Sequence, residues 1–124
     1  MMEVAVVIAK NGEPIYWHLP PGREAVRIPD TRTLNEVLVQ NRDLVQGVAH
    51  SHPGAGVPGP SYEDVTTFAA IEGNSWRLDW WIASQDHLVV CRWVGPDRLS
   101  YGRQVIADLP WVHELRRLSY SSPT

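Results

Sequence analysis

The chain has 124 residues, of which 44% are apolar and 20% charged, so it can bury the core of one domain and is not composed like a disordered segment. Its formal net charge of −3 argues against a protein that binds DNA through a basic surface, and we expect no nucleic-acid partner. Cys91 is the one cysteine, which excludes an intramolecular disulfide and a paired-cysteine zinc site, so a metal site must use histidine and carboxylate ligands.

The sequence shows no signal for export or for membrane insertion. Residues 1–9 include an apolar run, but the run is short and no basic residues precede it. No stretch of eighteen apolar residues occurs anywhere in the chain. We therefore expect no membrane partner and a cytoplasmic location.

Seven segments have the apolar and β-branched composition of strands. We predict strands over residues 3–9, 15–19, 25–28, 44–50, 78–83, 88–94 and 101–106. The first segment is rich in Val and apolar throughout, which is typical of a strand that is buried on both faces. Asn11-Gly12 lies between the first two segments and predicts a hairpin turn that pairs them.

Three further segments have the apolar spacing of helices. We predict helices over residues 31–41 and 62–72, and a short final helix that opens at Asp108-Leu109-Pro110. Asp30 and Ser61 are suitable N-terminal caps for the first two, and Gly73 ends the second. The side chains expected to face the core from the second helix are Val65, Phe68, Ala69 and Ile71.

Strands and helices alternate irregularly along the chain, and the sequence shows no internal repeat and no domain linker. This order predicts one α/β (α+β) domain, in which a mixed central β-sheet is flanked by helices. We expect the domain to span residues 1–118 and the tail, residues 119–124, to be frayed.

The segment over residues 47–64 is the most informative for function. His50 and His52 lie two residues apart at the end of a predicted strand, so their side chains point to the same face and can hold a metal ion together. Pro53 ends the strand. The Pro- and Gly-rich loop over residues 53–60 then leads directly into a helix, which favours a shaped loop within one domain over a flexible linker.

Asp64 supplies a third candidate ligand. It lies three residues after Ser61, in the first turn of the predicted helix, where its side chain faces back toward the end of the strand. Two histidines and one carboxylate with an open fourth position are typical of a catalytic zinc site. Each pattern alone has a simpler explanation, because His-x-His is often an exposed pair and Ser-x-x-Asp is often a helix capping box. A capping box can also position a ligand, so the two interpretations of Ser61 and Asp64 are compatible.

Together these residues resemble the motif of the JAMM (MPN+, Mov34/JAB) metalloproteases. In that family an upstream glutamate precedes His-x-His-Pro and Ser-x-x-Asp, which are here His50-Ser51-His52-Pro53 and Ser61-Tyr62-Glu63-Asp64. The interval between His52 and Asp64 holds eleven residues where the family usually has ten, an addition that the Pro- and Gly-rich loop can absorb. The resemblance covers residues 3–94 and implies the JAB/MPN (cytidine-deaminase-like) architecture for the mixed sheet.

The upstream glutamate is one of Glu3, Glu13, Glu24 and Glu36. In the family this residue begins a buried apolar strand, and residues 3–9 have that form. Glu13 falls in the predicted hairpin turn, Glu24 follows a Pro-Gly loop, and Glu36 lies on a predicted helix. We therefore choose Glu3.

The resemblance implies a zinc-dependent isopeptidase or peptidase of the compact prokaryotic or phage type. The implied ligands of Zn²⁺ are His50, His52 and Asp64. Glu3 is then the general base that activates water at the metal, and Ser61 hydrogen-bonds the oxyanion of the reacting carbonyl. The implied partner is a ubiquitin-like or sulfur-carrier protein, whose C-terminal tail carries the scissile amide bond.

Two other functions stay open at this point. A noncatalytic MPN-type module that binds other proteins usually lacks the metal ligands. A RadC-like, DNA-associated protein carries a similar motif, usually with Asn between the histidines, so Ser51 and the acidic net charge disfavour it. Structural roles are expected for Cys91, as a buried thiol, and for the remaining histidines, which are His18, His87 and His113.

Overall fold

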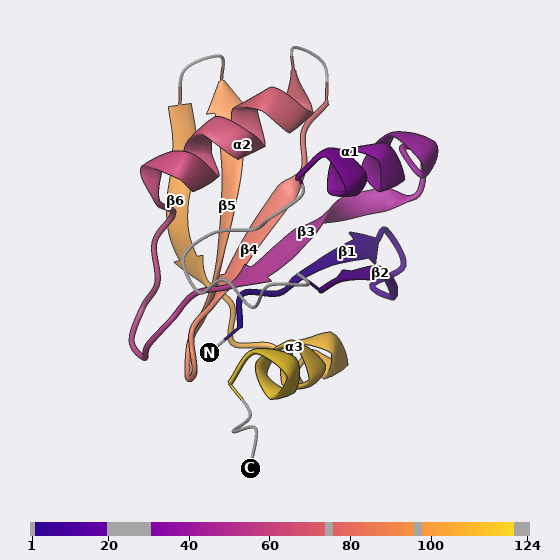
Figure 1. Cartoon of the computed structure of the whole chain (residues 1–124). Helices are drawn as coiled ribbons and strands as arrows, with labels where there is room; N and C mark the ends of the chain where they lie inside the picture. Colours follow the sequence, from indigo (N-terminus) through magenta and orange to yellow (C-terminus); the bar gives the residue numbers. More distant parts are fainter. Residues whose placement is uncertain (1, 20–30, 74–75, 96–97, 121–124) are drawn as a thin grey trace.

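A computed structural model describes residues 2–19, 31–73, 76–95 and 98–120 (Figure 1). The elements in these residues are β1 (Ala5–Ala9), β2 (Pro14–His18), α1 (Thr31–Gln40), β3 (Val45–Ser51), α2 (Tyr62–Glu72), β4 (Asp79–Ala83), β5 (Leu88–Gly95), β6 (Arg98–Gln104) and α3 (Pro110–Tyr120). The predicted mixed α/β fold is confirmed at this level. The strand expected at residues 25–28 and the cap expected at Asp30 lie outside the described residues.

Most element ends lie within two residues of the sequence-based expectation, and the start of β6 and the end of α3 differ in ways that change the description. Strand β6 begins at Arg98, three residues before the predicted start. Ser119 and Tyr120, which the sequence places in a frayed tail, instead complete the last turn of α3. Ser119 is buried and Tyr120 hydrogen-bonds two backbone carbonyls, so neither residue is frayed. Residues 121–124 lie outside the described residues.

The strands form one six-stranded sheet in the order β2-β1-β3-β4-β5-β6. Neighbours are antiparallel except β3 and β4, which are parallel and are joined through α2. The predicted β1–β2 hairpin is present, and Gly12 in its turn has a φ of 88°, a conformation that suits glycine. The parallel pair matters most for function, because β3 carries the two candidate histidine ligands.

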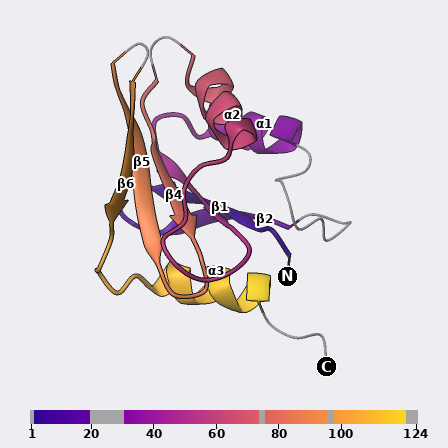
Figure 2. The same ribbon diagram turned by 90° about the vertical axis from the view of Figure 1, so that its left-hand side faces the viewer.

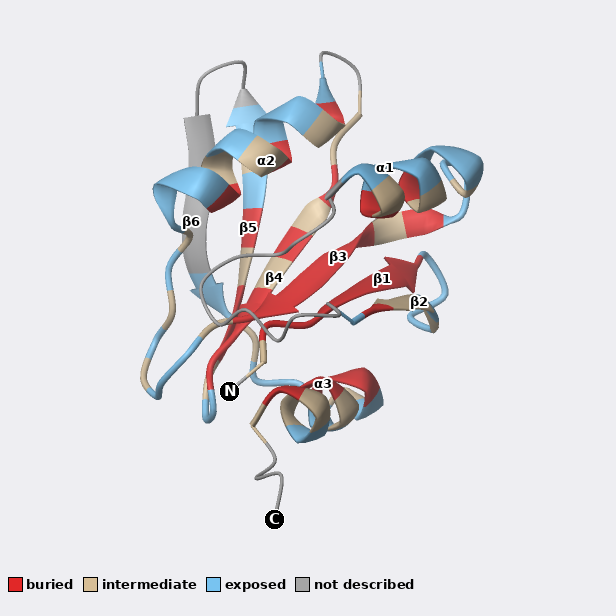
Figure 3. Cartoon of the chain, in the orientation of Figure 1, coloured by how far each residue is buried: buried red, intermediate tan, exposed pale blue. Residues whose placement is uncertain are grey.

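The sheet separates two apolar cores, and β1 contributes to both. Ala5 and Val7 pack with residues of α1 and α2, whereas Val6 and Ile8 pack with residues of α3. Figures 1 and 2 show α1 and α2 side by side, with α3 packed apart from them. Strands β1 and β3 are almost wholly buried (Figure 3), as the continuous apolar run at residues 3–9 predicts.

Helix α2 differs from its predicted core face at one position. Phe68 is buried and stacks on Trp80 with ring centroids 4.2 Å apart, but Ala69 is exposed. Glu72 is buried in its place and accepts hydrogen bonds from Trp80 Nε1 at 2.7 Å and the Leu78 N–H at 3.1 Å. Burial raises the pKa of Glu72, and these donors oppose that rise. The carboxyl therefore joins the end of α2 to β4.

No helix in the described part of the chain has both the length and the apolar character that crossing a membrane requires.

The parallel β3–β4 contact makes a stability prediction at Gly47. A Cβ at this position would lie 2.0 Å from the Asp79 carbonyl oxygen and 2.8 Å from the Trp81 ring. We expect Gly47→Ala to lower the free energy of unfolding by about 3 kcal/mol or more, because backbone and a packed ring must move. Urea unfolding measures the change.

Gly59→Ala is the matched control. A Cβ at Gly59 would meet no atom within 4 Å, so we expect a change of no more than about 0.5 kcal/mol. Equal stabilities of the two variants would show that β3 and β4 do not approach each other this closely.

Candidate metal centre

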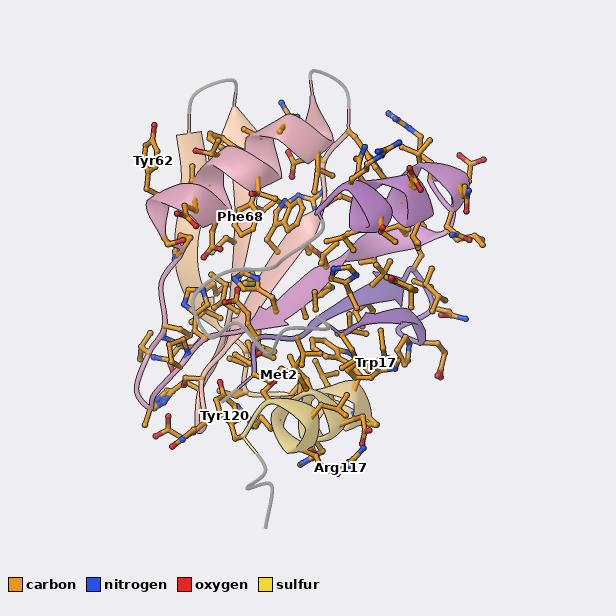
Figure 4. The ribbon with its side chains drawn as sticks, viewed as in Figure 1. Met2, Trp17, Tyr62, Phe68, Arg117 and Tyr120 are labelled. Carbon is orange, nitrogen blue, oxygen red and sulfur yellow. The ribbon has the colours of Figure 1, made fainter. Side chains whose placement is uncertain are left out.

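His50 and His52 share one face at the end of β3, as their spacing predicts. Their Nε2 atoms lie 3.0 Å apart, and the rings meet edge to face. His50 is fully buried and its ring lies against Phe68, with centroids 6.0 Å apart. Figure 4 labels Phe68 on the side of α2 that faces the sheet. The packing of α2 on β3 therefore orients the first of the two imidazoles.

Asp64 is both a capping residue and a candidate ligand. Ser61 is the N-cap of α2, and its Oγ accepts a hydrogen bond from the Asp64 N–H at 3.0 Å. In return, Asp64 Oδ2 accepts a hydrogen bond from the Ser61 N–H at 2.9 Å. The capping box is therefore present, and it aims the same carboxylate oxygen at the two imidazoles.

The three donor atoms have the spacing of a small metal site. Asp64 Oδ2 lies 2.8 Å from His52 Nε2 and 3.3 Å from His50 Nε2. Ligands bound about 2.0–2.2 Å from a tetrahedral zinc ion lie roughly 3.3 Å from one another. The side chains of His52 and Asp64 are 18% and 10% exposed, so the cluster can be reached from solvent. Within the described residues, it is the one group of three or more His, Cys, Asp or Glu side chains that could hold a metal ion.

The charge state of Asp64 favours a cation. Burial alone would raise the pKa of this carboxyl, but hydrogen bonds with His50 and His52 and from the Ser61 N–H hold the pKa well below its usual range. The side chain is therefore ionised at neutral pH. A deprotonated carboxylate beside two imidazoles is the form that binds a divalent metal.

One nitrogen of the cluster lacks a second contact. Nδ1 of His50 is buried and has no hydrogen-bond partner among the described residues. Metal-binding histidines usually donate a hydrogen bond from their other ring nitrogen. Within the described residues, His50 is oriented by packing against Phe68 rather than by such a bond.

Glu3 lies on the same face of the sheet as the cluster. Ala5 pairs with His50, and the Ser51 N–H donates to the Val4 carbonyl at 3.1 Å, so the register sets Glu3 opposite His52. Glu3 is only 2% exposed. Burial raises its pKa to about 8, and the negative charge of Asp64 adds to the rise. A carboxyl that holds a proton near neutral pH suits proton transfer.

The other glutamates considered from the sequence are placed differently. Glu13 is exposed in the β1–β2 turn, and Glu36 is exposed on α1. Glu24 lies outside the described residues. Of the described candidates, Glu3 is the buried one.

The loop between His52 and Ser61 is held in shape by the β4–β5 turn. The Gly56 N–H donates to Asp86 Oδ1 at 2.8 Å, and the Ser84 hydroxyl donates to the Gly56 carbonyl at 2.6 Å. Hydrogen bonds with His87 and from Gly56 lower the pKa of Asp86 to about 2. Gly54 and Gly56 have φ of 87° and 93°, a left-handed conformation that glycine adopts without steric strain. This conformation explains why glycine occupies both positions. The Pro and Gly pattern predicts a shaped loop, but nothing in the sequence points to Asp86 as its partner.

The sequence also gives no indication of Tyr120. Its hydroxyl donates to the carbonyl of His52, and the Ala83 carbonyl oxygen lies 3.0 Å away. The His52 N–H in turn donates to the same Ala83 carbonyl at 2.8 Å. The last turn of α3 therefore contacts the backbone of a candidate ligand.

No protein-family model matches this chain, and no curated protein matches it in sequence. The functional argument therefore rests on the residues of the centre.

Loss of one ligand is expected to abolish tight metal binding. We expect His52→Ala to weaken Zn²⁺ binding by more than about a hundredfold, a larger loss than removal of a supporting residue usually causes. Competition with a chromophoric chelator measures the affinity. His113→Ala is the control, because His113 is an exposed histidine that also pairs with an aspartate, Asp108. Equal affinities of the two variants would exclude His52 as a ligand.

The raised pKa of Glu3 makes a pH-dependent prediction for the metal-free protein. The unfolded chain loses this proton near pH 4.5 and the folded protein near pH 8, so the wild type loses stability between these values. The loss from this group is about 1.4 kcal/mol per pH unit. Glu3→Gln removes it, so the variant gains stability relative to the wild type as pH rises.

Urea unfolding at pH 5, 6.5 and 8 with a chelator present measures the difference. Glu13→Gln, in the exposed turn, should keep the slope of the wild type. Parallel slopes for the wild type and Glu3→Gln would show that Glu3 titrates normally.

Proposed function

We propose that the protein is a zinc-dependent peptidase or isopeptidase, which hydrolyses an amide bond at the C-terminal tail of a ubiquitin-like or sulfur-carrier protein. One observation carries the proposal. The donor atoms of His50, His52 and Asp64 lie 2.8–3.3 Å apart, and a buried carboxyl, Glu3, lies on the same face. Metal-assisted hydrolysis requires this combination of an open ligand set and a proton carrier.

The donor set favours zinc as the cofactor. Two imidazole nitrogens and one carboxylate oxygen suit Zn²⁺ better than Mg²⁺ or Ca²⁺, which prefer oxygen ligands. When bound, Zn²⁺ supplies a Lewis acid that polarises a carbonyl and lowers the pKa of a bound water to roughly 7. Fe²⁺ accepts the same set of ligands, so metal content is the first measurement to make.

Glu3 is assigned the proton transfers. Its carboxylate accepts the proton of the attacking water and later delivers it to the leaving amine. Burial raises the pKa of Glu3 in the metal-free protein, and a bound cation would lower it again toward the ionised form that accepts the proton. The neighbouring carboxylate of Asp64 favours protonation of Glu3 and so strengthens it as a base.

Ser61 is assigned to the substrate carbonyl. Its Oγ accepts the Asp64 N–H at 3.0 Å, which leaves the hydroxyl proton available to an incoming oxygen. A donor directed at developing negative charge contributes about 3 kcal/mol in enzymes that cleave acyl bonds. The exposed side of Ser61 at the start of α2 supports this role.

The surroundings of the centre support a polypeptide substrate. Tyr62 follows Ser61 and is 87% exposed, pointing away from the sheet (Figure 4). Val57, in the loop that precedes Ser61, is also exposed. Exposed apolar side chains in the segment that joins His52 to α2 can contact an extended chain end. Among polypeptide substrates, the resemblance to JAMM proteases favours the tail of a ubiquitin-like or sulfur-carrier protein. We also propose on this resemblance that the fold has the JAB/MPN architecture and that the protein is a compact cytoplasmic enzyme.

A cleavage assay tests the proposal. Ubiquitin-like and sulfur-carrier proteins with C-terminal extensions are incubated with the zinc-loaded protein, with and without a chelator, and the products are identified by mass spectrometry. We expect Glu3→Gln to keep zinc and to lower kcat by about 10²–10⁴-fold, because it removes the general base. Glu13→Gln is the matched control and should cleave normally.

Cleavage by metal-free His52→Ala would contradict the proposal. Little or no metal in the protein purified without added zinc would instead favour the noncatalytic MPN-type module. Binding to DNA that weakens with salt would favour the RadC-like alternative.

A further inference from the structure

The residue between the two histidines faces away from the metal centre and contacts the segment that carries Glu3. Ser51 is fully buried, and its Oγ accepts a hydrogen bond from the Val4 N–H at 3.0 Å. The Ser51 N–H donates to the Val4 carbonyl at 3.1 Å. Ser51 therefore binds both polar backbone groups of Val4. Its side chain accepts from the Val4 N–H, and its own N–H donates to the Val4 carbonyl.

A second serine holds the hydroxyl of Ser51. Ser119, in the last turn of α3, places its Oγ 2.8 Å from Ser51 Oγ and 2.7 Å from the Leu115 carbonyl oxygen. Each hydroxyl has one proton. If the Ser119 proton goes to the Leu115 carbonyl, the Ser51 proton is left for Ser119 Oγ, and the chain from the Val4 N–H to Leu115 uses each proton once. The Val4 carbonyl, 3.5 Å from Ser51 Oγ, is the other acceptor within reach of the Ser51 proton.

The same turn of α3 also contacts the other side of Glu3. The Met2 N–H donates to the Ser119 carbonyl at 2.8 Å, and Figure 4 shows Tyr120 beside Met2, where α3 meets the start of the chain. The backbone on both sides of Glu3 is thus hydrogen-bonded to Ser51 or Ser119. The hydroxyls of Ser51 and Ser119 lie on the α3 side of the sheet, away from the imidazoles, because Ser51 alternates with His50 and His52.

We propose that Ser51 and Ser119 are positioning residues, which fix the Glu3 carboxyl relative to His50, His52 and Asp64. The role rests on the proposed function. Neither serine faces the substrate side, so each acts through the Val4 backbone. A hydroxyl is required because the group must accept from an N–H and donate onward at once, which an alanine or valine side chain cannot do.

The test compares Ser51→Ala and Ser119→Ala with two matched variants. Val89→Ala truncates a buried side chain in the other core and controls for lost stability. Ser51→Thr keeps the hydroxyl, so it shows whether loss of that group, rather than any substitution at this position, causes the effect. Three properties are measured: Zn²⁺ affinity by chelator competition, exchange of the Val4 amide by NMR, and kcat on a fusion that the wild type cleaves.

We expect Ser51→Ala to bind Zn²⁺ within about threefold of the wild type, because the ligands are untouched. Its Val4 amide should exchange at least about tenfold faster, since its acceptor is lost. Its kcat should fall by about 10–100-fold, because the Glu3 carboxyl would no longer be held in line with His50, His52 and Asp64. Ser119→Ala should change the same properties in the same direction by less, and Ser51→Thr should restore them.

Two results would overturn the proposal. One is a Ser51→Ala protein with normal Val4 exchange and normal kcat. The other is a fall in kcat that Val89→Ala reproduces, since general destabilisation would then explain it. If the wild type cleaves no fusion, the proposed function fails and the positioning role fails with it, whereas faster Val4 exchange in Ser51→Ala would still establish the hydrogen bond.

Discussion

Because successive side chains of a strand point to opposite faces, His50-Ser51-His52 at the end of β3 serves both layers of the fold at once. The two imidazoles meet Asp64 on the α2 side, and the serine meets Ser119 on the α3 side. A slip of one residue in the β1–β3 register would exchange these faces and break both contacts. The close approach at Gly47, which brings β4 against β3, contributes to fixing this strand.

The electrostatics of the centre follow from this convergence. Two ring nitrogens and a carboxylate oxygen within 3.3 Å of one another share a proton or a cation, since their lone pairs otherwise repel. The capping hydrogen bond from the Ser61 N–H and the start of α2 add positive potential at Asp64. The helix end thus lowers the cost of keeping this carboxylate charged while it is largely buried.

The parts of the site that the sequence predicts are the local ones. Strand alternation predicts the shared face of His50 and His52, and the Ser61–Asp64 spacing predicts the capping box. The contact of Ser51 with Ser119 joins residues 68 positions apart, and its hydroxyl pair has no sequence pattern. The burial of Glu72 and the loop contact of Asp86 depend in the same way on which elements become neighbours. Such contacts follow from packing, which a single sequence does not specify by spacing.

The buried position of Glu3 lowers the stability of the fold while it places a carboxyl beside the candidate metal ligands. A buried carboxyl with a pKa near 8 costs folding free energy at neutral pH, whether it is ionised in the core or protonated there. The hydrogen bonds of Met2 and Val4 to the residues around α3 and β3 hold its backbone despite that cost. A cation on the three ligands would favour the ionised form of Glu3, because opposite charges attract in a poorly hydrated site. Metal binding and the proton of Glu3 are therefore linked, and each opposes the other.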